Sequence, residues 1–185
     1  MECKVLIIES RSHDDIFNDI HEGKTLKESL RLQGVHAELY EVATEDHLKS
    51  IVEVAAQESV RYVHISAHGS KDGFELTDGS DISWEKFDKI CWPHFKDCCL
   101  VFSSCDVAKG VDKLFDMHKT FCNAIVAPTR KIYWSEGLVA YSAFYHRASK
   151  NNSSTENDVK IMNKITEPKT FKFFSSPSRQ TTYVI

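Results

Sequence analysis

Short apolar segments alternate with helix-like patterns along most of this sequence, and that alternation constrains the fold more than any other feature. The apolar segments are residues 5–8, 36–42, 62–67, 98–102 and 124–127. The most continuous of them are typical of strands that are buried on both faces of a sheet. Strands that alternate with helices pack economically as a mostly parallel sheet with helices on both faces. The sequence therefore predicts an α/β fold, a three-layer α-β-α sandwich with a mostly parallel central sheet.

Helical periodicity fills the gaps between the apolar segments. Residues 24–33 predict one helix, and Thr44 is a suitable N-cap for a second, which carries apolar residues at positions 48, 51, 52 and 55. Further helices are expected over residues 84–91, 107–118 and 138–148. Residues 74–76 and 81–83, joined through an Asp-Gly pair, predict a small hairpin.

The composition is that of one globular domain. The chain has 185 residues, a net charge of −4 and 42% hydrophobic residues, enough to bury a sizeable core. The mild acidity argues against binding to nucleic acid or to an anionic membrane. The longest apolar runs fall far short of the ~20 residues that span a bilayer, and the first residues lack the pattern of a secretory signal. We therefore expect a cytoplasmic protein with reduced thiols and with neither nucleic-acid nor membrane partners.

A polar stretch divides the chain into three parts. Residues 1–149 form the predicted main domain. Residues 150–158 are rich in Asn and Ser, which favours an exposed, mobile loop. Residues 159–185 are expected to be a C-terminal extension that packs on the domain or docks a partner. Within this extension, the alternation of Phe171 and Phe173 favours an edge strand.

Two reactive side chains follow two of the predicted strands. His68 follows the strand at 62–67, and Cys105 follows the strand at 98–102. In sheets of this type ligands bind beyond the carboxyl ends of the strands, and adjacent strands lie ~4.8 Å apart. A His and a Cys at two such ends can therefore approach hydrogen-bonding distance, which is the arrangement of an activated thiol nucleophile. The spacing alone also fits a packed cysteine and an ordinary loop histidine.

The neighbours of these two residues suit the catalytic interpretation. Gly69 leaves the backbone room for a tight turn beside a substrate. Cys105 directly precedes the helix expected from Val107, and a helix N-terminus favours a thiolate over a thiol.

The sequence around His68 and Cys105 resembles the caspase-haemoglobinase clan of cysteine peptidases, and most closely its CHAT branch. That family's first motif is an apolar strand that ends in His-Gly, which here is residues 63–69, Val-His-Ile-Ser-Ala-His-Gly. Its second motif is an apolar strand that ends in small residues and Cys-Asp, which here is residues 100–106. A third element is Trp134, followed by a helix that contains a Phe-Tyr pair. The resemblance extends over about residues 4–149 and implies a caspase-like, CHAT-type catalytic domain.

The resemblance implies a cysteine endopeptidase that cleaves protein or peptide substrates. The thiolate of Cys105 would attack the peptide carbonyl, and His68 would act as general base and acid. The peptide nitrogens of Gly69 and Cys105 would form the oxyanion hole. Apart from the resemblance, Asp106 adjoins Cys105, and Asp72, Glu75 and Glu136 are expected to rim the cleft. Asp106 and Glu136 are the expected substrate-binding residues, because an acidic pocket would favour a basic residue before the scissile bond. In prokaryotes such proteases often act as effectors of defence or cell-death systems. The chain carries no repeat or sensor domain, so activation would come from an activating or regulatory protein partner, or the enzyme would have no activator.

Two other functions remain open on the sequence. The first is a catalytically silent caspase-like module that binds a partner protein. The second is a hydrolase or transferase of small molecules that uses the same cysteine.

The sequence predicts neither a metal site nor a cofactor. The potential zinc ligands nearest to one another in sequence are Cys91, His94, Cys98 and Cys99. Cys91 and His94 have a ligand-like spacing, but the sequence contains no Cys-x-x-Cys pair. Cys98 and Cys99 are consecutive residues of a strand and would point to opposite faces. His64 would lie ~13 Å from His68 on one strand, so it is expected to be a buried, hydrogen-bonded histidine. Residues 9–12 contain no glycine of the dinucleotide-binding fingerprint.

Overall fold

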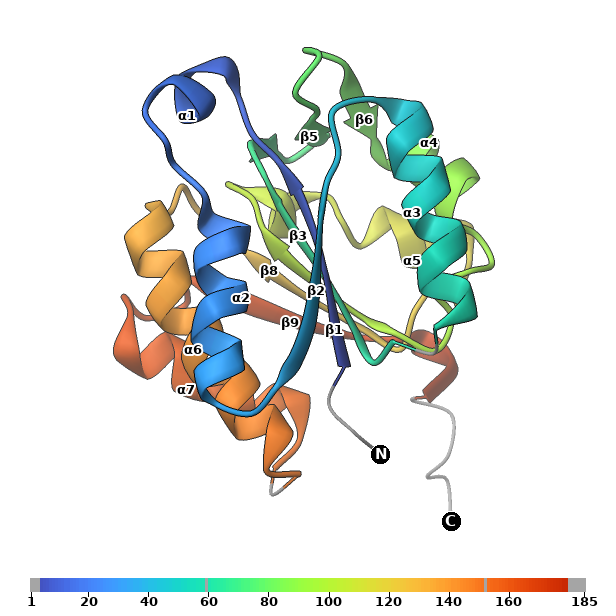
Figure 1. Ribbon diagram of the computed structural model, residues 1–185. Coiled ribbons are helices and arrows are strands. Elements are labelled where there is room, and N and C mark those ends of the chain that lie inside the picture. The colour runs from blue at the N-terminus through green and yellow to red at the C-terminus, as the bar shows by residue number, and fades with distance from the viewer. Residues whose placement is uncertain (1–3, 59, 152, 180–185) are drawn as a thin grey trace.

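The central element of the fold is a six-stranded sheet with the strand order β2-β1-β3-β7-β8-β9 (Figure 1). The computed structural model describes residues 4–58, 60–151 and 153–179. The strands are β1 (Lys4–Ser10), β2 (His36–Glu41), β3 (Tyr62–Ala67), β7 (Cys99–Ser103), β8 (Ala124–Pro128) and β9 (Phe171–Ser175). The first five run parallel, and β9 pairs antiparallel with β8. This mostly parallel sheet confirms the predicted α/β fold.

The sheet is buried on both faces because its strands alternate between two apolar clusters. On β1, Leu6 and Ile8 point into one cluster, while Val5 and Ile7 point into the other. Each of these four side chains is at most 1% exposed. This two-sided burial is the reason that the strand is a continuous aliphatic run.

Helices cover both faces of the sheet and complete the three layers (Figure 1). The first layer holds α2 (Glu22–Leu32), α6 (Trp134–Ser149) and α7 (Thr155–Ile165). The second holds α3 (Glu45–Gln57), α4 (Trp84–Cys91) and α5 (Lys113–Met117). The hydroxyl of Thr44 accepts a hydrogen bond from the peptide N–H of His47, which confirms the predicted N-cap of α3.

A second, three-stranded sheet lies between β3 and α4 in the chain. It consists of β4 (Gly69–Ser70), β5 (Gly73–Glu75) and β6 (Asp81–Ser83). The last two are the predicted hairpin, and β4 extends it to the residue that follows His68. The hairpin therefore stands directly beside the carboxyl end of β3.

Three segments differ from the sequence prediction. The helix expected over 107–118 is divided into a three-residue 3-10 helix, η1 (Val107–Lys109), and the short helix α5. An additional helix, α1 (His13–Phe17), follows β1. The loop expected over 150–158 ends at Ser154, which caps α7, and Asp158 is buried against Arg147.

The C-terminal extension packs on the domain over the residues that the structure describes. Helix α7 lies against α6, and β9 is the predicted edge strand. A 3-10 helix, η2 (Pro177–Arg179), follows β9. Residues 180–185 of the expected extension lie outside the described residues.

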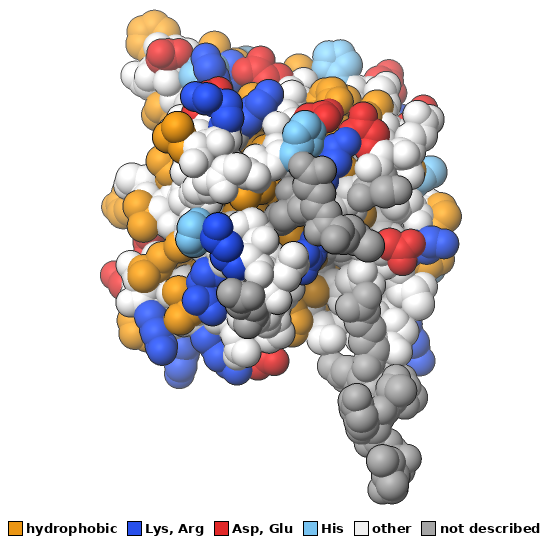
Figure 2. All heavy atoms as spheres, turned by 60° about the horizontal axis from the view of Figure 1, so that its bottom comes forward, with side chains coloured by type: hydrophobic (Ala, Val, Ile, Leu, Met, Phe, Trp, Pro, Cys, Tyr) orange, Lys and Arg blue, Asp and Glu red, His pale blue; other side chains and the backbone are white. Residues whose placement is uncertain are grey.

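The end of the molecule that is lowest in Figure 1 is turned forward in Figure 2. Both basic and acidic side chains appear on this face (Figure 2). Within the described residues, no helix has the length and apolar character needed to cross a bilayer.

Candidate active site

The pairing of β3 with β7 brings the two predicted catalytic residues side by side. The last registered pair of these parallel strands is Ser66 with Ser103. His68 and Cys105 each follow that pair by two residues, so they emerge at the same level from adjacent strands. Both line one cavity of about 140 Å³, together with Ala67, Ser103, Ile132, Tyr133 and Trp134.

Close backbone packing holds the two strand ends together. A Cβ atom on Gly69 would lie 2.8 Å from Cβ of Ser104 and 3.3 Å from the carbonyl oxygen of Cys105. Only glycine allows this approach without a shift of one chain. Beyond the cysteine, Asp106 adopts a left-handed conformation with φ of 61° and donates its peptide N–H to the carbonyl of Arg130. The chain therefore turns sharply away after Cys105.

A buried carboxylate that the sequence analysis missed holds the imidazole of His68. Oδ2 of Asp15 lies 2.7 Å from Nε2 of His68, and the Asp15 side chain is 7% exposed. The short helix α1 positions this carboxylate through a reciprocal cap, in which Ser12 and Asp15 each accept from the other's peptide N–H. A Ser-x-x-Asp pattern at residues 12–15 is the sequence signal that would have located this helix start.

Asp15 stays ionised despite its burial. Burial pushes the pKa of this carboxyl up, but the hydrogen bonds from Ser12 and from His68 outweigh burial and hold the pKa below its usual value. An ionised partner at Nε2 fixes the proton of a neutral imidazole on that nitrogen. Nδ1 of His68 is then the nitrogen that can accept a proton.

Trp134, the first residue of α6, contacts both Asp15 and His68. Its indole N–H donates to Oδ1 of Asp15 at 3.3 Å, and its ring packs edge-on against His68 with 5.5 Å between ring centroids. Trp134 thus contacts both members of the pair, which gives this residue of the third family-like element a positioning role.

Cys105 differs from the other cysteines in its exposure. It is partly exposed, whereas the other cysteines that the structure describes, Cys91, Cys98, Cys99 and Cys122, are buried. Burial raises the pKa of Cys98 to about 12 and the pKa of Cys91 and Cys122 well above the usual thiol value. Sγ of Cys105 lies 3.7 Å from the carbonyl oxygen of Ile132. Cys105 is therefore the described thiol that a reagent or substrate can reach.

The helix that was expected to stabilise a Cys105 thiolate is too short to do so. Only the three residues of η1 follow the cysteine, and the predicted longer helix from Val107 is wrong. Three residues sum to a small macrodipole. The predicted helix therefore gives no support for a thiolate at Cys105.

The two predicted substrate-binding carboxylates each face a basic side chain. Asp106 forms an ion pair with Lys109. Glu136 forms an ion pair with Arg130, and this pairing with Glu136 raises the pKa of Arg130. A basic substrate group would have to compete with these partners.

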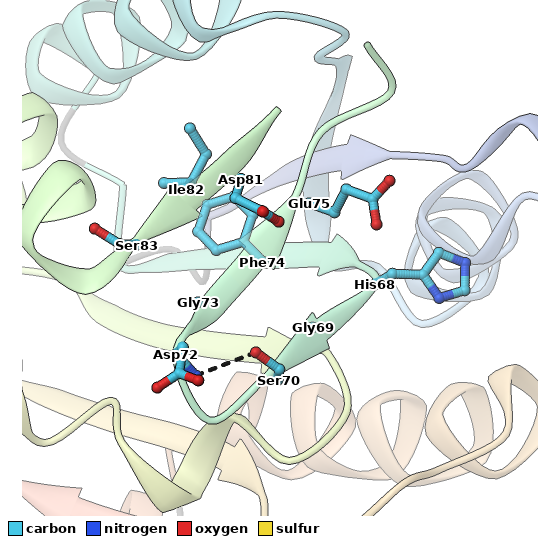
Figure 3. Close-up of a pocket in the computed structure, with 10 residues that line it drawn as sticks. All are labelled: His68, Gly69, Ser70, Asp72, Gly73, Phe74, Glu75, Asp81, Ile82 and Ser83. Atoms are coloured by element: carbon cyan, nitrogen blue, oxygen red, sulfur yellow. Dashed lines mark hydrogen bonds between the residues drawn. The ribbon is translucent and has the colours of Figure 1, made fainter. Parts of the chain in front are cut away.

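A larger hollow of about 470 Å³ lies on the other side of His68, against the hairpin (Figure 3). Three carboxylates line it, those of Asp72, Glu75 and Asp81. Glu75 and Asp81 stand directly opposite each other on β5 and β6, and Asp72 is paired with Lys71. Like charges that face each other across two strands destabilise the pair, so a cation between them would be favourable. In Figure 3 the Glu75 carboxylate points toward the side on which His68 lies.

His64 is a buried, hydrogen-bonded residue, as predicted. It is fully buried, and its Nδ1 lies 3.1 Å from the hydroxyl of Tyr145. Its Nε2 lies 3.5 Å from Oε2 of Glu22 on α2. His64 therefore joins β3 to both α2 and α6 beneath the cavity.

No protein-family model matches this chain, and no curated protein matches it. What the fold and the site define is an α/β protein with a cysteine, a histidine and a buried aspartate gathered at the carboxyl edge of its sheet.

Proposed function

We propose that this protein is a caspase-like cysteine endopeptidase in which Cys105 is the nucleophile, His68 the general base and acid, and Asp15 the group that orients His68. One observation carries the proposal: the partly exposed thiol shares a cavity with an imidazole whose Nε2 lies 2.7 Å from a buried carboxylate. A nucleophile, a base and an orienting group in this relation are the parts of a catalytic triad.

The proposed reaction begins with proton transfer from Cys105 to Nδ1 of His68. The thiolate attacks the peptide carbonyl and forms a C–S bond, and negative charge develops on the carbonyl oxygen. Asp15 stabilises the imidazolium through Nε2–H. The imidazolium then protonates the leaving amine as the C–N bond breaks. Water, deprotonated by His68, hydrolyses the thioester and restores the thiol.

The backbone of β4 supports the proposed oxyanion hole. The peptide N–H of Glu75 donates to the carbonyl of His68 at 2.9 Å, which makes these two residues a hydrogen-bonded pair of the antiparallel ladder. Hydrogen-bonded and non-hydrogen-bonded pairs alternate in such a ladder, so Gly69 and Phe74 form a non-hydrogen-bonded pair. The N–H of Gly69 therefore points away from β5, and we assign it, with the N–H of Cys105, to the oxyanion.

The proposed substrate is an extended peptide with a basic residue near the scissile bond. Glu75 and Asp81 line the hollow beside His68, and a Lys or Arg side chain between them would relieve their mutual repulsion. Asp106 and Glu136 remain proposed substrate contacts, which would exchange Lys109 and Arg130 for the substrate's basic group. The proposed role as an effector of prokaryotic defence rests on the resemblance alone.

Cleavage of a peptide library tests this proposal directly. The wild type should cut, and the Cys105→Ala variant should lose cleavage by at least a thousandfold. Cys98→Ala removes a buried thiol at the opposite end of β7 and should keep activity, provided that its melting curve shows a folded protein. Equal cleavage by wild type and Cys105→Ala would remove Cys105 from the mechanism and reject the proposal.

A protein-binding module is the second candidate, because two large apolar side chains are exposed on or next to the elements that carry the site. Phe17 is 88% exposed and Tyr133 is 81% exposed, and both adjoin elements that hold the triad. A module without catalysis would show neither cleavage nor a selectively reactive Cys105. Either of these two observations in the wild type favours the peptidase.

A further inference from the structure

A second cluster of ionisable side chains lies at the carboxyl ends of β1 and β2, apart from the proposed triad. It contains Glu9, Glu41 and His21, the residue that precedes α2. Glu9 and Glu41 are register partners on adjacent parallel strands, so their side chains leave the sheet on the same face. One potential ligand atom from each of the three residues lies within 4.8 Å of the others.

Two of these residues present buried atoms that have no hydrogen-bond partner within the described residues. Glu9 is 2% exposed, its Oε1 accepts from the peptide N–H of Gly23 at 2.6 Å, and its Oε2 is left without a partner. Nδ1 of His21 is also buried without a partner, and it lies 3.8 Å from Oε1 of Glu41. A buried polar atom without a partner costs stability, so both atoms would gain from a ligand.

The charges around the cluster favour a cation. The carboxylates of Glu9, Asp19, Glu22 and Glu41 contact or act on it electrostatically. Arg11 opposes them, with Nη1 at 3.1 Å from Nε2 of His21 and Nη2 at 3.2 Å from Oε1 of Glu41. One guanidinium does not balance four carboxylates. It approaches His21 from the Nε2 side. Oδ1 of Asp19 lies 3.0 Å from the same Nε2 and can accept its proton, and the lone pair of Nδ1 is then free on the side that faces Glu41.

We propose that Glu9, His21 and Glu41 bind one divalent transition-metal ion, through Oε2 of Glu9, Nδ1 of His21 and a carboxylate oxygen of Glu41. Two carboxylates with one imidazole suit zinc, whereas calcium and magnesium prefer oxygen ligands alone. Binding requires that the three ligand atoms move closer together and that Nε2 of His21 carries the imidazole proton toward Asp19. Arg11 must then give up its contacts with both Nε2 of His21 and Oε1 of Glu41.

The ion would also brace the segment that carries Asp15. Glu9 and His21 lie at the two ends of residues 10–20, which include α1. An ion bound to both would close this loop and reduce its conformational freedom. By ordering this segment, the ion would help to hold Asp15 in place within the proposed triad. Metal binding itself does not depend on any catalytic role of Cys105.

Titration calorimetry with zinc chloride tests the proposal. The protein used is Cys105→Ala, because this variant removes a thiol that could bind zinc beside His68. We expect one zinc ion per chain, with at least a tenfold weaker affinity in Glu41→Gln and in Glu9→Gln. Asp14→Asn, an exposed change on α1, is the matched control and should bind like the parent. The Glu41 side chain is 57% exposed, so its variant should fold even if Glu9→Gln does not.

Two results would overturn the proposal. One is the absence of one-to-one zinc binding, and the other is binding that Glu41→Gln leaves unchanged. Amide hydrogen exchange in the same Cys105→Ala protein gives a second readout, in which zinc should slow exchange in residues 10–21 and leave α6 unaffected. Unchanged exchange in residues 10–21 would reject the bracing role. Since neither readout uses peptide cleavage, failure of the metal site stays separate from failure of the peptidase proposal.

Discussion

Replacement of Asp15 by Asn should slow the reaction of Cys105 with a thiol reagent by about tenfold at neutral pH. Asn has nearly the shape of Asp, so it fills the same space at the start of α1. It removes the negative charge that faces Nε2 of His68 at 2.7 Å. The imidazolium then loses its stabilising partner, and the thiolate–imidazolium pair becomes less populated.

The magnitude follows from the geometry of that contact. A hydrogen bond to a charged group contributes about 1.5–3 kcal/mol. The His68 side chain is 46% exposed, so solvent screening favours the lower end of that range. About 1.4 kcal/mol corresponds to one pKa unit and thus to roughly a tenfold lower thiolate fraction. Alkylation proceeds through the thiolate, so its rate should fall by the same factor.

The assay is alkylation by iodoacetamide at pH 7, followed for each cysteine by peptide mapping in a mass spectrometer. A Cys3→Ser background confines the signal to cysteines that the structure describes. Cys105 should label first in the parent protein, about tenfold more slowly in Asp15→Asn and at the parent rate in Asp14→Asn. If Asp15→Asn and Asp14→Asn label Cys105 at equal rates while both remain folded, Asp15 does not act on the thiol through His68.

Three further predictions follow from the same geometry. Gly69→Ala should cost about 1–3 kcal/mol of stability and most of the cleavage, because its Cβ would lie 2.8 Å from Cβ of Ser104; Ser70→Ala, an exposed neighbour, is the control, and equal melting temperatures and activities would contradict the argument. The pKa of Asp15 is lowered, since hydrogen bonds from Ser12 and His68 outweigh its burial. Its contribution to stability should therefore be complete above pH ~4, the unfolded-state value, and be lost as pH falls below it. Urea unfolding of wild type and Asp15→Asn should then differ most at neutral pH, and a constant difference down to pH 2 would refute this linkage. Combined Glu75→Gln and Asp81→Asn should lower kcat/KM for peptides with Lys or Arg relative to neutral peptides, and an unchanged ratio would remove both residues from substrate selection.

The strands of the sheet could be predicted closely because a strand that is buried on both faces is a continuous run of apolar residues. Strand β3 has the predicted bounds, residues 62–67, and β7 differs from its prediction by one residue at each end. The same apolar runs predicted that His68 and Cys105 follow two neighbouring strands, because the segment between them is long enough for a crossover to an adjacent parallel strand.

Short helices were less predictable because their signals are few and local. Helix α1 has five residues with one buried side chain, Asp15, so it offers no apolar stripe. The helix expected from Val107 is interrupted at Gly110, where a Cβ would lie 2.0 Å from the carbonyl oxygen of Lys71. Lys71 belongs to the turn between β4 and β5, so no local sequence pattern contains this contact. In α7, the buried residues Val159 and Met162 follow a polar first turn, which the sequence analysis assigned to a loop.

Only part of the candidate site could be predicted from the sequence, because some of its residues lie on short local elements that are far apart in the chain. His68 and Cys105 belong to strand ends, whereas Asp15 reaches His68 across 53 positions through a loop. The proposed metal ligands are likewise far apart in the chain: α1 lies between Glu9 and His21, and α2 lies between His21 and Glu41. Groups of this kind become neighbours only when the sheet is assembled.

A crystal structure of the protein with a peptide chloromethyl ketone that carries Lys or Arg would test the central claim most directly. We expect a covalent bond to Sγ of Cys105, with Nδ1 of His68 within hydrogen-bonding distance of the attached group and the inhibitor's carbonyl oxygen bound to the N–H of Gly69. A reagent bound to another cysteine, or an imidazole turned away from the modified sulfur, would contradict the proposed mechanism.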